Sequence, residues 1–430
     1  MEKYKANVKE LAPGVRFCAV KTGAFKTACL SFSMALPLEE DLEAKAVLPF
    51  LLHRACRKYP DFTKLSGRLA ELYGAALSAA VSKLGEAHVL NLSITAIDDR
   101  FALDDESVAL SCAKLLLDLI FDPNVGKEEF LQEDIKREKR LLTEKIESEI
   151  NNKRAYAMRR CEALMCENEK FGLSPLGEKS KVGELNGKKV YEAWREVLKT
   201  AGIQISFAGS ADTAELEEVI AREFSKIKRQ PAVIKTEFIK SSDSSRYFSE
   251  EMAVEQGKLV LGFRAGMENE DDDNVATKVM TYLYGGSPHS KLFLNVREKM
   301  SLSYYCSSAF SKTKGLVFVQ SGIDTDKEEA ATSAILDQLE ALKKGDFTDE
   351  ELAFSKLSMT DALRAVEDSP EGIVAWYDSQ ITRDEFTTPY LEAQKIEAIG
   401  REDIIRAAQR VTLDTIFMLK GTLEGDGNED

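Results

Sequence analysis

Apolar and polar residues alternate in short segments along both halves of the chain, with the period of two that is typical of β-strands. In the first half, this alternation predicts strands at residues 15–20, 28–34, 76–83, 88–97 and 203–209. In the second half, it predicts strands at residues 258–263, 302–306, 315–320 and 415–421. The last strand of each series ends in a glycine, Gly209 and Gly421, which indicates that the second half repeats the first.

Between these strands, apolar residues recur at the spacing of amphipathic helices. The first half has helical segments at residues 42–57, 62–73, 127–166, 190–199 and 211–227. The second half has helical segments at residues 274–283, 327–344, 349–381 and 401–411. The pair Ser369-Pro370 is expected to break the segment 349–381, because proline disfavours a helical residue before it. The order of elements therefore predicts an α+β fold with two domains of one topology.

A polar stretch that contains a serine cluster divides the two halves. We interpret residues 229–249 as a linker, which leaves an N-terminal domain at residues 1–228 and a C-terminal domain at residues 250–423. The acidic residues 424–430 are expected to form a disordered tail.

The amino-acid composition and net charge exclude some classes of protein. Of the 430 residues, 44% are hydrophobic and 30% are charged, which is typical of a globular protein, and the formal net charge is −15. This negative charge argues against nucleic acid or an anionic membrane as the partner, and no apolar run is long enough to span a bilayer. The seven cysteines form no C-x-x-C pair, and no signal peptide is evident. We therefore predict a cytoplasmic protein with reduced thiols.

One stretch of the second half has the residue types of a binding site. Gly285-Gly286 permits a tight turn, and the apolar residues that follow it predict a helix with Arg297 in its last turn. The pattern then changes to a strand, with Tyr304 at its beginning. This layout can place a guanidinium and a phenol side by side at a pocket mouth. Taken alone, the pattern favours the simpler interpretation, in which Arg297 is a surface arginine and Tyr304 a core tyrosine.

This stretch resembles the C-terminal-domain signature of the insulinase/pitrilysin family of metallopeptidases, which includes the mitochondrial processing peptidases. In that family, a glycine-rich turn leads to a Ser-Arg-Leu-Phe-like helix and then to Arg-Glu-Lys-Arg-Gly-Leu-Ala-Tyr. The chain has Ser-Lys-Leu-Phe at residues 290–293 and Arg-Glu-Lys-Met-Ser-Leu-Ser-Tyr at residues 297–304. The likeness extends over nearly the whole chain. It implies a half-clamshell α+β fold whose two similar domains are each a largely antiparallel sheet packed with helices.

The resemblance also implies roles for single residues. In the family, the arginine and the tyrosine hold the substrate backbone close to the catalytic zinc, and these positions correspond to Arg297 and Tyr304. Gly285 and Gly286 belong to the same substrate-binding motif. The chain is therefore expected to bind a peptide.

The catalytic half of the family pattern is missing. Active members carry His-x-x-Glu-His on an N-terminal helix, where the two histidines bind zinc and the glutamate is the general base, and a later helix supplies a glutamate ligand. Here Pro49 stands at the first ligand position, Leu52 at the general-base position and His53 at the second ligand position. On the later helix, Lys145 replaces the third ligand, with Glu144 one residue away as the alternative.

The histidine count supports this conclusion without any alignment. The chain has three histidines (His53, His88 and His289), and no two of them are four residues apart. A leucine cannot activate water, and a lysine near the metal position repels a cation. His53 and Cys56 share a helix face, but no third ligand is evident beside them. We therefore expect no catalytic residue, no metal and no cofactor, and no zinc peptidase activity from this chain alone.

Two functions remain from different classes. The first is a non-catalytic, substrate-holding subunit of a two-chain peptidase, whose partner is a zinc-bearing paralogue. The second is a non-enzymatic structural or regulatory scaffold, which forms a homodimer with itself. A third possibility, another chemistry in the retained chamber, has no acid–base pair to support it. In these departures, and in residues 138–142 and 159–166, the chain also resembles a bacterial subgroup that is encoded near a zinc-bearing paralogue and is associated with modification of elongation factor P.

Overall fold

The computed structural model describes residues 4–103, 106–267 and 274–422, so the predicted acidic tail at 424–430 lies outside the described residues. The chain forms two compact units that are interleaved in sequence. Unit 1 contains the residues up to Glu147 together with Leu173–Lys235 and Leu363–Tyr390. Unit 2 contains Ser148–Gly172, Thr236–Ala362 and the residues from Leu391 onward. A single boundary at residues 229–249 does not describe this interleaved division.

Each unit is built on one mixed sheet. The sheet of unit 1 has the order β1 (Asn7–Ala12), β2 (Val15–Lys21), β6 (Gly202–Gly209), β3 (Thr27–Pro37), β5 (Ala87–Ile97) and β4 (Ala76–Leu84). The sheet of unit 2 has the order β7 (Arg246–Met252), β11 (Thr412–Gly421), β8 (Gly257–Arg264), β10 (Leu316–Ile323) and β9 (Tyr305–Ser311). In each sheet only one described pair is parallel, β2 with β6 and β11 with β7. The prediction of largely antiparallel sheets is therefore confirmed.

The strand orders also confirm the repeated topology. If β1 is set aside, the five strands of unit 1 and the five strands of unit 2 follow the same spatial order. The glycine-ended strand of each half, β6 or β11, lies between a parallel neighbour and an antiparallel neighbour in both sheets. The sequence likeness of these two strands thus reflects equivalent places in two copies of one fold.

Helices cover both faces of each sheet. Unit 1 has α1 (Glu43–Ala46), α2 (Leu48–Leu52), α3 (Phe62–Glu71), α4 (Val108–Phe121), α5 (Gln132–Ser148), α7 (Lys179–Gly183), α8 (Gly187–Thr200), α9 (Thr213–Ser225) and α13 (Pro370–Asp378). Unit 2 has α6 (Lys153–Met165), α10 (Asn274–Gly285), the π-helix η4 (Leu292–Lys299), α11 (Glu328–Lys343), most of α12 (Asp349–Ala365) and α14 (Pro389–Ala398), and α15 (Arg401–Gln409). Short 3₁₀ turns η1 (Asp99–Phe101), η2 (Glu149–Asn151), η3 (Lys170–Gly172), η5 (Thr325–Lys327) and η6 (Val366–Asp368) connect some of them.

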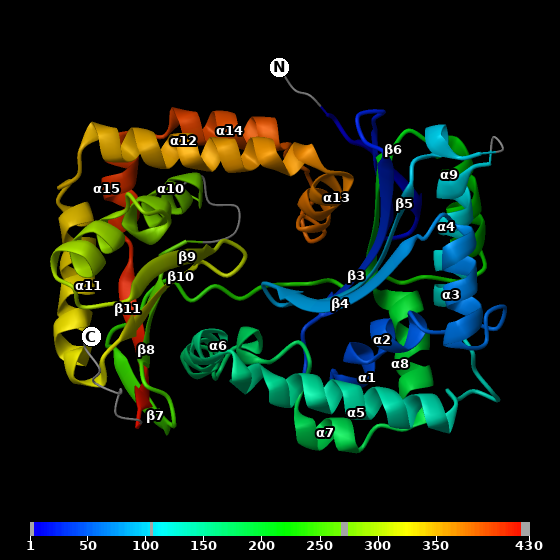
Figure 1. Ribbon diagram of the computed structural model, residues 1–430, viewed down its shortest axis with the longest axis horizontal. Coiled ribbons are helices and arrows are strands. Elements are labelled where there is room, and N and C mark those ends of the chain that lie inside the picture. The colour runs from blue at the N-terminus through cyan, green and yellow to red at the C-terminus, as the bar shows by residue number, and fades with distance from the viewer. Residues whose placement is uncertain (1–3, 104–105, 268–273, 423–430) are drawn as a thin grey trace, which may run out of the picture. The chain divides into compact units, whose positions relative to one another are not determined.

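One helix of each unit comes from the opposite half of the sequence. In unit 1, α13, which is orange in Figure 1, packs on β3 and β6. In unit 2, α6 packs on β8 and β11. Side chains alternate across β3, so Phe32 points into the apolar core while Ser31 faces α13.

Buried polar contacts hold both of these helical segments. In unit 1, Asp378 accepts a hydrogen bond from the hydroxyl of Ser31 at 2.6 Å and another from the hydroxyl of Ser206. In unit 2, Glu169, which follows α6, pairs with Arg264 and Lys314, each at 2.7 Å. Both segments are thus fixed by specific bonds as well as by apolar packing.

Several predicted boundaries are wrong for local reasons. The segment 127–166 is two helices, because the side chain of Asn152 accepts a bond from the Ala155 N–H and so caps a new helix, α6. Strand β7 begins at Arg246, inside the range predicted as a linker. The predicted break at Ser369-Pro370 is confirmed, since Ser369 caps α13 with Pro370 in its first turn.

Candidate functional site

The predicted glycine turn lies where α10 meets the segment that leads to η4, in unit 2. A Cβ atom on Gly285 would lie 2.6 Å from the backbone nitrogen of Ser308, and one on Gly286 would lie 2.5 Å from the ring of Tyr282. Both positions therefore need glycine for close packing within the unit. The structure does not test a direct role of these glycines in substrate binding, which stays a prediction.

Arg297 is carried by η4, whose backbone is wound as a π-helix. Hydrogen bonds such as that from the Met300 N–H to the Asn295 carbonyl, at 3.1 Å, span five residues. Segments of this kind are frequent at functional sites. The Arg297 guanidinium lies 4.4 Å from the ring centroid of Phe293, and its Nε lies 3.6 Å from Glu298. With its side chain 40% exposed, Arg297 keeps N–H groups available for a ligand.

Tyr304 is a surface residue that is hydrogen-bonded in a row with two other polar side chains. Its side chain is 53% exposed, which excludes the core tyrosine that the sequence alone allowed. The Tyr304 hydroxyl donates to Oδ1 of Asp324 at 2.9 Å, and Lys327 Nζ donates to Oδ2 of Asp324 at 2.7 Å. The bond to Asp324 raises the pKa of Tyr304, while the bonds from Lys327 and Tyr304 lower the pKa of Asp324.

A strained turn joins the two predicted residues. Ser301 has φ of 52°, a left-handed conformation that favours glycine, at the place where the family motif has glycine. After this turn, the Tyr304 N–H bonds to the carbonyl of Gly322 at 2.9 Å and so brings the chain alongside β10. Arg297 and Tyr304 make separate contacts, and in the described part of the chain no hydrogen bond or ion pair joins them.

The degenerate zinc motif lies in unit 1, on α2. Pro49 and Leu52 are buried there, with Leu52 only 3% exposed and packed in the main apolar cluster of the unit. His53 follows the helix and is half-buried. Burial lowers the pKa of His53, and the nearby Arg54 lowers it further. The positions of the first ligand and of the general base are therefore filled by apolar core side chains.

The later helix, α5, lies against α2. Lys145 Nζ is 4.4 Å from the ring centroid of Phe50, and Arg54 Nε is 3.5 Å from the buried carboxylate of Glu138. Glu144 pairs instead with Arg140 at 3.8 Å, and both side chains are largely exposed. Lys145 and Glu138 are thus the residues of α5 that contact residues 50–54, and the assignment of the third ligand position to Lys145 stays a prediction.

These residues do not fit a zinc ion. Zinc requires several nitrogen, sulfur or oxygen ligands around one point. Here a proline and a lysine stand at two of the predicted ligand positions, and a leucine stands at the predicted general-base position. Within the described ranges, no three His, Cys, Asp or Glu side chains lie close enough together to hold a metal. Cys56, the other ligand candidate near His53, is fully buried, and burial raises the pKa of its thiol. No metal-dependent step can be assigned to this unit.

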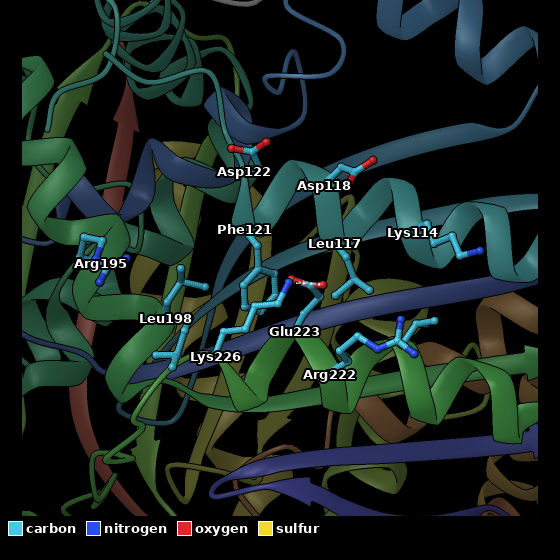
Figure 2. A pocket seen from close by; sticks show the side chains of 12 residues that line it. Lys114, Leu117, Asp118, Phe121, Asp122, Arg195, Leu198, Arg222, Glu223 and Lys226 are labelled. Carbon is cyan, nitrogen blue, oxygen red and sulfur yellow. Dashed lines mark hydrogen bonds and ion pairs between the residues drawn. The ribbon is translucent and has the colours of Figure 1, made fainter. Parts of the chain in front are cut away.

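A separate hollow of about 600 Å³ lies on the outer helices of unit 1, between α4, α8 and α9. Figure 2 shows apolar side chains such as Leu117 and Phe121 in its lining, with the paired Lys226 and Glu223 beside them. The two charged groups lie 2.6 Å apart. None of the predicted site residues lines this hollow. Its lining has no histidine, cysteine or hydroxyl side chain, and two of its charged groups, Lys226 and Glu223, are paired with each other.

Sequence reasoning missed the partners of Tyr304. Asp324 and Lys327 lie 20 and 23 residues further along the chain, just beyond the end of β10. Their only sequence signal is an acidic residue directly after a buried strand, which is common at strand ends. The hairpin register of β9 and β10, which places Tyr305 opposite Gly322, brings them together.

Comparisons with known proteins agree with this description. Residues 184–359 match the family model described as Peptidase M16 inactive domain. A protein of Bacillus subtilis (strain 168) described as "Probable inactive metalloprotease YmfF" is 32% identical over 97% of this chain and 99% of its own length. A second protein of that organism, "Uncharacterized zinc protease YmxG", is 25% identical over 46% of this chain and 47% of its own length.

The fold is also found among solved structures. A conserved protein from Enterococcus faecalis V583 matches with a TM-score of 0.88 and 27% identity, over 98% of this chain and all of its own. Among the residues that the structure describes, no helix is both long and apolar enough to cross a membrane. The cytoplasmic location stays a prediction.

Proposed function

The chain belongs to the M16 family of peptidases as an inactive homologue, and from that premise we propose that it is the substrate-holding subunit of a two-chain peptidase. Its partner is a related chain that carries the zinc motif. In the mixed complex, the partner supplies the metal and the general base. This chain binds the peptide backbone through Arg297 and Tyr304.

The observation that supports the proposal is a difference in burial between the two halves of the family motif. Pro49 and Leu52 are buried in apolar packing, and Lys145 faces the same place with a positive charge. In contrast, Arg297 and Tyr304 are about half exposed, so part of their hydrogen-bonding capacity is accessible to a ligand. One half of the motif has become core, while the other half is still able to bind.

The division of labour is physically reasonable. Groups that hold a substrate backbone act through position, so they serve equally well from either chain of a complex. The Bacillus subtilis relatives support it, because that organism has both a probable inactive metalloprotease and a zinc protease that resemble this chain.

The test uses the mixed complex with the zinc-bearing relative from the same host. Arg297→Ala and Tyr304→Phe should each lower the rate of peptide cleavage about tenfold, the effect of losing one good hydrogen bond, without changing assembly. Lys299→Ala on the same helix and Tyr247→Phe, a tyrosine with 50% exposure, are the matched controls. Unchanged turnover in both test variants would refute the substrate-holding role.

A scaffold function is the second candidate, and one observation favours it. The close packing around Gly285 and Gly286 shows that part of the motif supports the fold whether or not a peptide binds. In that case the protein forms a homodimer with no affinity for unstructured peptides. Sedimentation of the purified chain together with peptide-binding titration separates the two candidates.

A further inference from the structure

The hydrogen bonds that join Tyr304, Asp324 and Lys327 determine whether the Tyr304 hydroxyl donates or accepts toward a ligand. A phenol has one proton, and the proton of Tyr304 is donated to Oδ1 of Asp324 at 2.9 Å. Lys327 holds the other oxygen, Oδ2, at 2.7 Å, so the carboxylate is fixed from both sides. The exposed part of the Tyr304 hydroxyl is therefore its oxygen lone pair.

The charge states of Asp324 and Tyr304 keep these three side chains in this arrangement. The bonds from Lys327 and Tyr304 lower the pKa of Asp324, so near neutral pH it is a carboxylate that accepts and cannot donate. The bond to Asp324 raises the pKa of Tyr304, so its phenol keeps its proton. The shared proton thus stays between the two oxygens, with Tyr304 as donor.

Resting on the proposed function, we propose that Asp324 and Lys327 position Tyr304 as a hydrogen-bond acceptor, which recognises one backbone N–H of a bound extended peptide. Arg297 has only donors and suits a peptide carbonyl. Together the two side chains match the N–H and C=O groups of one peptide. Because proline lacks an N–H, a proline or an N-methylated residue is rejected at the recognised position.

This inference differs from a purely structural role in what it predicts. If Asp324 only closed the end of the β9–β10 hairpin, its removal would change stability and leave the peptide preference unaltered. Asp324 and Lys327 are both partly exposed, with side chains 36% and 42% accessible, so replacing Asp324 should leave the fold intact. The preference for an N–H is therefore the informative measurement.

The experiment is a scan with a short fluorescein-labelled unstructured peptide that contains no proline. Each residue in turn is replaced by its N-methyl counterpart, and affinity is measured by fluorescence anisotropy. Wild type should bind one N-methyl copy about tenfold more weakly than the parent peptide, the cost of an unmade hydrogen bond. Asp324→Ala and Tyr304→Phe should both abolish this discrimination. Asp326→Ala, an exposed neighbour in the same turn, should keep it.

The outcomes separate this inference from the proposed function. If Arg297→Ala and Tyr304→Phe bind the parent peptide as tightly as wild type does, the proposed function fails. If those variants weaken binding but the wild-type scan is flat, only the assignment of Tyr304 as an acceptor fails. Discrimination that persists in Asp324→Ala would likewise overturn the positioning role of Asp324.

Discussion

The former zinc motif in unit 1 and the Arg297–Tyr304 segment in unit 2 come from the two halves of one family pattern, yet their surroundings are opposite. Pro49 and Leu52 are buried among apolar side chains, where a polar replacement would lose its contact with water. Arg297 and Tyr304 are about half exposed and contribute little to a core. A polar ligand at the buried positions is therefore opposed by folding, whereas the exposed pair is accessible to a binding partner.

The largest expected effect is on the stability of unit 1. Leu52→Glu places a charge at a position that is 3% exposed and apolar, and should lower the free energy of unfolding by about 3–5 kcal/mol, the cost of an uncompensated buried charge. Urea titration measures this change. The matched control is Leu141→Glu on α5, which is 37% exposed and should change stability by less than about 0.5 kcal/mol. Equal effects would mean that the general-base position is not part of the core.

The second effect is on peptide affinity in unit 2. Arg297→Ala and Tyr304→Phe should each weaken binding of an unstructured peptide to the isolated chain about tenfold, or about 1.4 kcal/mol, because each removes one hydrogen-bonding partner. Calorimetric titration gives the affinity, and urea titration should show stability within about 0.5 kcal/mol of wild type. Loss of stability with unchanged affinity would give both residues a structural role.

The third effect is on the stability of the turn between Arg297 and Tyr304. Ser301 has a left-handed backbone, so Ser301→Gly should relieve strain, partly offset by the greater flexibility of glycine in the unfolded chain. We expect a net gain of about 0.5 kcal/mol, seen as a small rise in the midpoint of urea unfolding. A destabilised variant would show that the serine side chain makes a favourable contact that outweighs the strain.

The smallest expected effect is a pH dependence at the former motif. Burial lowers the pKa of His53 in the folded state, so the unfolded chain takes up the proton first as the pH falls. The contribution of His53 to stability is therefore present above its ordinary pKa of 6.5 and is lost as the pH falls through the folded value. Buried His88, whose pKa is lowered to about 4 by burial, acts in the same direction.

The substitution His53→Gln removes the contribution of His53 to the pH dependence of stability and leaves that of His88. The variant should lose less stability than wild type between pH 7 and pH 5, as followed by urea titration at each pH, while the dependence due to His88 remains. A steeper loss in the variant would mean that protonated His53 is stabilised in the folded protein, in conflict with its half-buried place beside Arg54.

The repeated topology could be predicted from the sequence because it is visible in local patterns of residues. Gly209 and Gly421 end equivalent strands, and their place in the two sheets confirms the repeat. Lys145 lies beside Phe50 of the degenerate motif, and its correspondence to the family's third zinc ligand stays a prediction. These features depend on single residues or on short periodic segments.

Features that depend on distant contacts were missed. The transfer of α6 and α13 to the opposite units leaves no local signal, since a helix has the same periodicity whichever sheet it covers. Strand β7 was missed for a local reason instead, since its polar and charged residues follow a serine cluster and are typical of a linker. The bond from Tyr304 to Asp324 arises from the register of β9 with β10, which no single-sequence pattern specifies.

The central claim is that catalysis and peptide holding are divided between two related chains. The most direct measurement is to tag this chain in its native host, purify it gently and identify its stoichiometric partner by mass spectrometry. We expect a related chain of similar size that carries His-x-x-Glu-His. Recovery of the protein with only itself, or with an unrelated assembly, would contradict the account and leave the scaffold function in its place.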